Sequence, residues 1–352
     1  MAADAHIAWF EETGLGDRER VGGKGGSLGE LKRAGIDVPP GFIVCTGVFE
    51  RFLESLERAA PVRAAVSALS CDELGAISAC SSALRQRIEA AELPPDLLEE
   101  LGAAHERLIG AASAQPVAVR SSATCEDAAD ASFAGLQDTY LWVQGAAQMI
   151  RRVRSCWASL YSAESISYRL THGFAEERVA MAVVVQQMVD ARTAGVMFTR
   201  SPTTGDRSVV TIEGAWGLGS AVVGGEVTPD RWVLGKITGE ISTREISDKA
   251  IRHAPVAGGG VESVAIEEDR RRAPCLSDAE LQELRTLARR IERHYGCAQD
   301  IEWAIDRGSG VIFVLQSRPE TVWSARDAEP IARREKDPLM HLMSIFGSRR
   351  CP

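Results

Sequence analysis

Three polar side chains near the end of the chain have the types needed to hold a metal-bound phosphate. Glu302 lies in one short strand with period-two alternation, and Gln316 and Arg318 lie in the next, after a glycine-containing turn. A register that pairs residue 302 with residue 316 would place a carboxylate beside an amide oxygen, with a guanidinium one step further along. Two oxygen ligands suit Mg²⁺, and a fixed cation suits phosphate.

The register of this hairpin is open by one residue. A slip by one residue would send the polar side chains to opposite faces. Strict alternation also places Gln316 and Arg318 on the same face as Ile312 and Val314. The alternative interpretation is an ordinary edge hairpin with its polar residues in solvent, and the hairpin alone favours neither.

A glycine-rich segment with one lysine, residues 21–27, is a second candidate. Its glycines would let main-chain amides approach a phosphate, and Lys24 would supply a point charge. The spacing is not that of a Walker A loop, because Arg18 stands where that motif has its first glycine and Gly25 follows the lysine. Taken alone, the segment favours a flexible surface turn.

Three further segments could contact a nucleotide. Arg120 ends an apolar strand, where it suits an anion or a structural salt bridge equally well. Residues 132–139 form a glycine-containing loop with hydroxyls at both ends, which could cover a phosphate. Residues 186–189 (Gln-Gln-Met-Val) close an apolar strand and would offer main-chain groups and a soft Met side chain to adenine. The alternative for this run is the end of a core strand.

The composition is that of an ordinary globular protein. The chain has 352 residues, 45% of them hydrophobic and 25% charged, and a net charge of −9, which argues against a nucleic-acid partner. Its eight cysteines show no metal-ligand spacing, so we expect neither zinc nor disulfides. There is no signal peptide and no apolar run of the roughly 18–20 residues that a membrane helix needs. We therefore expect a cytoplasmic protein without a membrane partner.

The periodicity changes along the chain. Residues 48–112 have helical spacing and Ala-, Leu-, Glu- and Arg-rich composition, whereas β-like runs follow from residue 179. A helix is then predicted to begin with the capping box Ser277-x-x-Glu280 and to end at Gly296. The six histidines are scattered and none lies in a nucleophilic context.

Taken in order, these segments resemble the ATP-binding domain of the phosphoenolpyruvate synthase and pyruvate phosphate dikinase family, over roughly residues 8–322. Their order and spacing make a chance match unattractive. The motifs that carry the resemblance are Gly-Gly-Lys-Gly-Gly-Ser-Leu-Gly-Glu-Leu (22–31), Val-Pro-Pro-Gly-Phe (38–42), Val-Arg-Ser-Ser-Ala-Thr-Cys-Glu-Asp (119–127), Ser-Phe-Ala-Gly (132–135), Asp-Thr-Tyr-Leu (138–141), Ala-Gly-Val-Met-Phe-Thr (194–199), Trp-Gly-Leu-Gly (216–219), Gly-Glu-Val-Thr-Pro-Asp (225–230), Gln-Asp-Ile-Glu-Trp-Ala (299–304) and Leu-Gln-Ser-Arg-Pro-Glu-Thr (315–321).

The resemblance implies an α+β protein with the ATP-grasp fold. ATP would lie between an N-terminal lobe (residues 1–184, with the helical section at about 48–112) and a C-terminal lobe (residues 185–322), and residues 323–352 would form a tail. The implied cofactors are ATP and Mg²⁺.

The resemblance also assigns roles by motif position. Lys24, Arg120 and Arg318 would be the catalytic residues that contact the phosphates, and Glu302 and Gln316 would bind Mg²⁺. The residues implied in nucleotide binding are Ser132, Gly135 and Thr139 over the phosphates and Gln186, Gln187, Met188 and Val189 at the adenine. Leu136 stands where many relatives have Gln, which puts one contact of the loop in doubt.

The implied activity is an ATP-dependent, dikinase-type phosphoryl transfer. Family enzymes continue into a domain whose Thr-Ser-Gly-Gly-type loop carries a phosphorylatable His, and no such loop occurs here. We therefore expect a separate partner subunit with that His and the acceptor site for a small molecule. The products would be AMP, phosphate and a phosphorylated small molecule, with phenylphosphate, made from phenol by a split member of the family, as the preferred identity.

Other functions stay open at this point. The alternatives are the ATP domain of a phosphoenolpyruvate synthase-like enzyme or of a rifamycin phosphotransferase, a non-catalytic ATP-sensing subunit, and an ATP-grasp carboxylate ligase. The last would release ADP in place of AMP. Retention of Glu302, Gln316 and Arg318 argues against a pure sensor, which would not need them.

Overall fold

The computed structural model describes residues 6–110, 115–124 and 138–323. The chain divides into two units, Met1–Pro319 and Glu320–Pro352, and all helices and strands named below belong to the first. Their mixture of helices and antiparallel sheets confirms the α+β class. Among the described residues, no helix has the length and apolar character needed to cross a bilayer.

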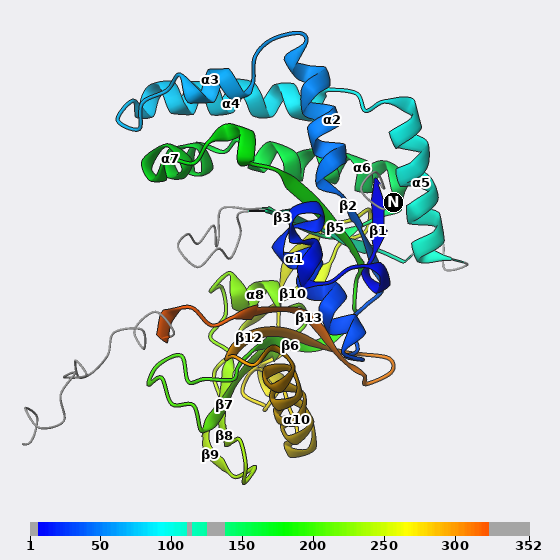
Figure 1. Cartoon of the computed structure of the whole chain (residues 1–352). Coiled ribbons are helices and arrows are strands. Elements are labelled where there is room, and N and C mark those ends of the chain that lie inside the picture. The colour runs from blue at the N-terminus through cyan, green and yellow to red at the C-terminus, as the bar shows by residue number, and fades with distance from the viewer. Residues whose placement is uncertain (1–5, 111–114, 125–137, 324–352) are drawn as a thin grey trace, which may run out of the picture. The chain divides into compact units, whose positions relative to one another are not determined.

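The strands of the first unit form two large antiparallel sheets and one separate hairpin (Figure 1). The five-stranded sheet has the order β1-β2-β5-β3-β4, the six-stranded sheet has the order β13-β12-β6-β7-β8-β9, and β10 pairs with β11. The strands are β1 (Ile7–Trp9), β2 (Gly41–Val44), β3 (Val117–Ala123), β4 (Thr139–Val143), β5 (Met181–Gln187), β6 (Ala191–Phe198), β7 (Val209–Trp216), β8 (Asp230–Gly235), β9 (Ile241–Glu245), β10 (Ile251–Pro255), β11 (Val261–Ala265), β12 (Gln299–Asp306) and β13 (Ile312–Pro319).

Helices cover the faces of both large sheets. The α-helices are α1 (Arg18–Arg33), α2 (Thr46–Glu57), α3 (Arg63–Ser67), α4 (Leu74–Ala90), α5 (Pro95–Ile109), α6 (Gly145–Ser159), α7 (Ala163–His172), α8 (Ser220–Val223), α9 (Glu268–Arg271) and α10 (Asp278–Tyr295); the 3₁₀ turns are η1 (Phe10–Glu12), η2 (Leu15–Asp17) and η3 (Glu176–Arg178). Helices α2 to α6 contribute to one apolar core with the five-stranded sheet, in which Phe52 stacks on Trp157 at a centroid distance of 4.9 Å.

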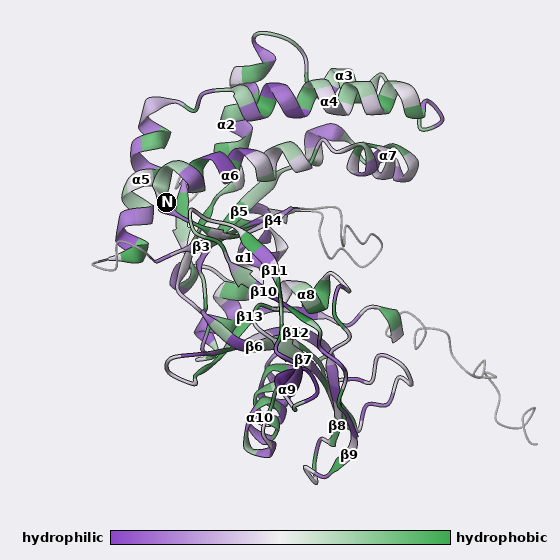
Figure 2. Cartoon of the chain, turned by 180° about the vertical axis from the view of Figure 1, so that it is seen from behind, coloured by the Kyte–Doolittle hydropathy of each residue, from purple (hydrophilic) through white to green (hydrophobic). Residues whose placement is uncertain are grey.

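Helix α10 covers one face of the six-stranded sheet. The predicted capping box is confirmed, because Ser277 Oγ accepts from Glu280 N–H and the Glu280 carboxylate accepts from Ser277 N–H. The helix ends at Gly296 in the left-handed conformation, also as predicted. Its buried residues recur at helical spacing, and Figure 2 shows the helix banded in apolar green and polar purple.

Helix α1 holds the glycine-rich segment, which is therefore not a flexible surface turn. Val21 is fully buried, and the helix contacts β3 and β5 of one large sheet and β13 of the other. The segment meets β3 very closely: Ser122 Oγ donates to the Val21 carbonyl and accepts from the Gly25 N–H. A Cβ on Gly22, whose φ is +70°, would lie 2.1 Å from the Ser122 carbonyl oxygen. Glycine is required here because no side chain fits between the helix and the strand.

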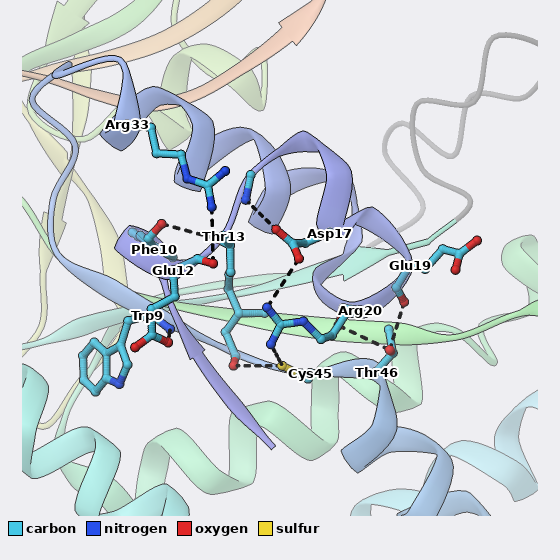
Figure 3. A network of polar contacts seen from close by, with 12 residues as sticks. Trp9, Phe10, Glu12, Thr13, Asp17, Glu19, Arg20, Arg33, Cys45 and Thr46 are labelled. Carbon is cyan, nitrogen blue, oxygen red and sulfur yellow. Dashed lines mark hydrogen bonds and ion pairs between the residues drawn. The ribbon is translucent and has the colours of Figure 1, made fainter. Parts of the chain in front are cut away.

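A polar network fixes the start of α1 (Figure 3). Thr46 Oγ1 donates to the carbonyls of Glu19 and Arg20, and the Arg20 guanidinium contacts both the Asp17 carboxylate and Cys45 Sγ. Asp17 in turn accepts from the Gly14 N–H. These contacts join the start of α1 to the beginning of α2. Between them and Lys24, α1 is kinked at Gly22, whose φ of 70° and ψ of 177° are not helical.

We expect Gly22→Ala to lower the free energy of unfolding by about 2 kcal/mol or more, because it adds both a backbone strain and a clash with Ser122. Urea denaturation measures this change. Gly102→Ala is the matched control: Gly102 lies inside α5 with open space around its Cβ position, so alanine should raise stability by about 0.5–1 kcal/mol. Equal stability of the two variants would contradict the tight approach of α1 to β3.

Candidate nucleotide site

A cavity of about 230 Å³ lies between the two large sheets. Strands β3, β4 and β5 contribute to it from the five-stranded sheet, and β6, β12 and β13 from the six-stranded sheet, together with the segment that leads into α8. It is lined by Ala118, Arg120, Thr139, Leu141, Gln186, Gln187, Met188, Val189, Ala191, Ala194, Gly195, Leu218, Gly219, Ser220, Val223, Glu302, Trp303, Ala304 and Leu315. The lining is mostly apolar with a few polar groups, as is usual for small-molecule sites.

Arg120 joins the two sheets at this cavity. Its guanidinium donates to Glu302 Oε2 at 2.8 Å, to Gln316 Oε1 at 2.5 Å and to the Leu315 carbonyl at 3.1 Å. The interactions are charge-assisted and partly shielded from water, so they are stronger than the same contacts on an open surface. The structure therefore brings three of the residues predicted from the sequence into one cluster.

The hairpin register places Glu302 directly opposite Gln316, which resolves the one-residue ambiguity. The next pair is Trp303 with Val314, so a β-bulge leaves Leu315 without a partner on β12. This bulge corrects the strict alternation expected from the sequence. Ile312 and Val314 lie in the core beside α10, whereas Gln316 meets Arg120 on the cavity side with Glu302. The extra residue is what turns the amide toward the carboxylate.

Two buried nitrogen atoms at the cavity lack a hydrogen-bond partner among the described residues. They are Arg120 Nε and Gln186 Nε2. An unpaired buried donor costs free energy, so a ligand that accepts from it gains that energy on binding. The cavity is thus prepared to donate hydrogen bonds at two places, one on each of the adjacent strands β3 and β5.

Residues 186–189 form the end of β5 and the two residues after it. The Gln187 side chain donates to the Leu108 carbonyl at 2.7 Å, and both main-chain groups of Met188 bond within the protein, to the Pro116 carbonyl and to the Gln115 side chain. The side chains of Met188 and Val189 pack in a small apolar cluster with Ala191, Ala194, Leu218 and Ala304. This segment therefore offers an apolar wall, with Gln186 as its unpartnered polar group.

Lys24 and Arg318 do not line the cavity. Lys24 lies on α1 near Cys156, whose thiol pKa is raised well above its usual range by burial while the Lys24 charge acts in the opposite direction. Arg318 pairs with Asp300, Nε to Oδ2 at 3.4 Å, and its side chain is partly exposed. Thr139 lines the cavity and is the cross-strand partner of Arg120, whereas Ser132 and Gly135 lie outside the described residues.

The donor atoms present suit a magnesium ion that takes most of its ligands from water and phosphate. Among the described residues there is no group of three or more His, Cys, Asp or Glu side chains that could enclose a metal. Glu302 and Gln316 offer one carboxylate and one amide oxygen, side by side and both oriented by Arg120. This fits Mg²⁺, which typically takes one or two protein carboxylates and completes its shell with water and substrate phosphates.

Sequence reasoning missed a hydrogen-bonded chain beside the cavity. Ser220 lines the cavity, and its Oγ lies 2.7 Å from His253 Nδ1, while His253 Nε2 lies 3.1 Å from Glu226 Oε2. The residues come from α8, the following loop and β10, so their meeting is a matter of tertiary structure. The Trp-Gly-Leu-Gly run before Ser220 was the only local signal.

Comparison with known proteins decides the family. Residues 18–338 match the model of the family described as "Pyruvate phosphate dikinase, AMP/ATP-binding domain". The chain belongs to this family. Proteins named "Probable phosphoenolpyruvate synthase" from Staphylothermus marinus and Methanocaldococcus jannaschii are each 39% identical to it, over 94% and 97% of the chain, and the "Phosphoenolpyruvate synthase" of Pseudomonas aeruginosa is 40% identical over 98%.

A solved structure, the D-alanyl-alanine synthetase A of Vibrio cholerae, matches with 14% identity and a TM-score of 0.25, covering 70% of this chain and 56% of that one. A likeness at that score supports no argument about the fold.

The relatives correct the expectation of a separate partner subunit. The chain spans 43%, 29% and 46% of the length of the three relatives above, so their matching region is one part of a single longer chain. The prediction that a separate polypeptide carries the phosphorylatable His is therefore wrong. A covalent connection gives a high effective concentration of one part near another without a subunit interface.

Proposed function

We propose that this chain is the ATP-binding and phosphoryl-transferring part of a phosphoenolpyruvate synthase-like enzyme. The proposal rests on the cluster of Arg120, Glu302 and Gln316 at the cavity between the two large sheets. Names of the relatives favour pyruvate as the final acceptor over phenol, which was the preferred identity from sequence. The net reaction would convert ATP to AMP and phosphate.

The fold proposed is the ATP-grasp fold, with the nucleotide between two lobes. The cavity between the five-stranded and six-stranded sheets supports it. We place the lobe boundary after β5, because a boundary at residue 184 would cut that strand, which runs from Met181 to Gln187 within the five-stranded sheet. Magnesium, with Glu302 and Gln316 as its protein ligands, would neutralise charge on the phosphates.

Different residues would bind different parts of ATP. Gln186 would donate to the adenine ring, with Met188 and Val189 against its face. Arg120 and Lys24 would hold the phosphates, and Arg318 would stabilise the transferring phosphoryl group. Ser132, Gly135 and Thr139 would cover them. Positioning and charge stabilisation of this kind are the main sources of catalysis in phosphoryl transfer, since little covalent chemistry is left for the protein.

Binding of ATP should depend strongly on magnesium. One carboxylate and one amide oxygen bind the ion firmly only when the phosphates supply further ligands. Calorimetry with purified protein should show at least tenfold weaker ATP binding in EDTA than in excess Mg²⁺. Adenosine, which has no phosphate, serves as control and should bind equally in both buffers. Equal ATP affinity with and without metal would contradict the assignment of Glu302 and Gln316 as magnesium ligands.

Gln186→Leu should weaken ATP and adenosine alike, by about tenfold, because it removes the donor for the base. The protein without nucleotide should keep its stability, since Gln186 Nε2 has no partner to lose among the residues that the structure describes. Its neighbour provides the contrast: Gln187→Leu removes a bond to the Leu108 carbonyl and should cost about 1 kcal/mol in urea denaturation. A loss of stability without a loss of nucleotide affinity in Gln186→Leu would contradict the assignment.

Arg318→Ala should weaken binding of the phosphates without affecting binding of the base. We expect ATP affinity to fall by about tenfold or more while adenosine affinity stays unchanged, because a charge-assisted contact to phosphate is lost. Stability should change by less than about 1 kcal/mol, as for other exposed ion pairs. Arg231→Ala is the matched control, since Arg231 pairs with Glu213 and Glu245 and lies on β8, which is separated from β13 by three strands of the six-stranded sheet. Equal losses for ATP and adenosine would show that Arg318 acts on the fold.

A further inference from the structure

A second cavity, of about 140 Å³, lies at one end of the six-stranded sheet and is lined by four arginines. It shares no lining residue with the nucleotide cavity. The lining residues are Arg192, Arg252, Arg270 and Arg307, with Trp216, Ala265, Ile266 and Glu267.

The four arginines come from four separate places in the chain. Arg192 lies on β6 where the pairing with β12 shifts register, so that Ile305 faces Thr193 and Asp306 faces Ala191. Arg252 lies on β10, Arg270 on α9 and Arg307 in the turn between β12 and β13. Because none of them neighbours another in sequence, their convergence is a property of the fold.

Two of these arginines already have anionic partners. Arg192 forms an ion pair with Glu280 and also donates to the Cys275 carbonyl at 3.5 Å. Arg307 pairs with Asp190 at 3.4 Å and donates to the Ala191 carbonyl at 3.2 Å. Both guanidiniums are therefore held in place while still facing the cavity.

The other two lack a carboxylate partner within the described part of the chain. Arg252 forms no ion pair with any residue that the structure describes. The Arg270 guanidinium lies over the Trp216 ring at 4.8 Å, and the indole Nε1 donates to the Arg270 carbonyl at 3.1 Å. Glu267 is the single acid among the lining residues. Like charges gathered around a small concave space repel one another and raise the local affinity for an anion.

We propose that this cavity binds the phosphate group of a small phosphorylated metabolite, at a site separate from the nucleotide site and independent of its function. A phosphate monoester carries nearly two negative charges at neutral pH, which matches the two unpaired arginines. The planar guanidinium fork donates two parallel hydrogen bonds to phosphate oxygens, which a lysine cannot do. The volume, little more than half that of the nucleotide cavity, leaves room for a phosphate with a few carbon atoms.

This cavity is close to the nucleotide site along the backbone. The Gly217 N–H donates to the Arg192 carbonyl at 3.0 Å, which holds the turn between Trp216 in one cavity and Leu218 in the other. A phosphate bound beside Trp216 would thus be separated along the chain from Leu218, a lining residue of the nucleotide cavity, by Gly217 alone.

Titration of inorganic phosphate into the purified chain tests the proposal. The titration is done by calorimetry at constant ionic strength, in the presence of saturating Mg-ATP so that phosphate cannot enter the nucleotide cavity, and again without nucleotide. We expect one phosphate to bind in the presence of Mg-ATP and at least one in its absence, and acetate to bind at least tenfold more weakly. Failure to bind ATP would count against the proposed function alone, since the arginine variants assign phosphate binding to this cavity whether or not nucleotide is bound.

Three variants connect the binding to the arginines. Arg252→Ala combined with Arg270→Ala should weaken phosphate at least tenfold. The control is Arg271→Ala combined with Arg272→Ala, which removes two neighbouring arginines that pair with Asp248 outside the cavity, and it should bind as the unchanged protein does. Glu267→Gln should bind phosphate several-fold more tightly, and a gain of affinity cannot result from misfolding. Loss of binding when ATP is present, equal binding by the first variant, equal affinity for acetate, or no gain in Glu267→Gln would overturn the proposal.

Discussion

The close approach of α1 to β3 is the constraint on which the rest of the structure depends. Gly22 lets the helix backbone meet Ser122, where a side chain would overlap the strand, and the Gly25 N–H donates to Ser122 Oγ. The same helix contacts β13 of the other large sheet, so its position also sets how the two sheets face each other. The hydrogen bonds of Ser122 with the Val21 carbonyl and the Gly25 N–H join α1 to β3, the strand that carries Arg120.

The cavity that results has two chemically different ends. Toward β5 it is apolar, with Gln186 as the polar exception, and this end suits a flat heterocycle. Toward the β12–β13 hairpin it is polar, and the bulge at Leu315 brings Gln316 to the side of Glu302. A molecule that is apolar and planar at one end and highly charged at the other fits this division, which is why family membership and geometry support the same ligand.

Local signals in the sequence were sufficient for local structure. The capping box at Ser277 depends on neighbours in the chain and was predicted, whereas the pairing of Glu302 with Gln316 was one of the registers that the sequence left open. The glycine-rich segment was misread because glycines in a row favour a turn, whereas here Gly22 forms a kink packed against Ser122 and the residues on either side of it are helical. The bulge at Leu315 also escaped prediction, since alternation gives no sign of one extra residue.

Contacts between distant segments could not be read in advance. Ser220, Glu226 and His253 meet only because α8 lies beside β10, and the convergence of the arginines around Trp216 has the same origin. The roles of all the predicted site residues stay predictions, and Lys24 and Arg318 do not line the cavity. The separate subunit was inferred from a missing motif, and the length of the relatives overturned it.

The hydrogen bonds of Arg120 have a consequence for the heat of binding. In the unliganded protein its guanidinium already donates to Glu302, Gln316 and Leu315, so the protein carries its own anion where a phosphate would arrive. A phosphate that engages this arginine exchanges one set of charge-assisted bonds for another, and the enthalpy gained there is small. In the proposed binding mode, burial of the base against Met188 and Val189 would have no such internal competitor. The apolar end should therefore dominate the heat-capacity change, because loss of apolar surface from water is what that quantity records.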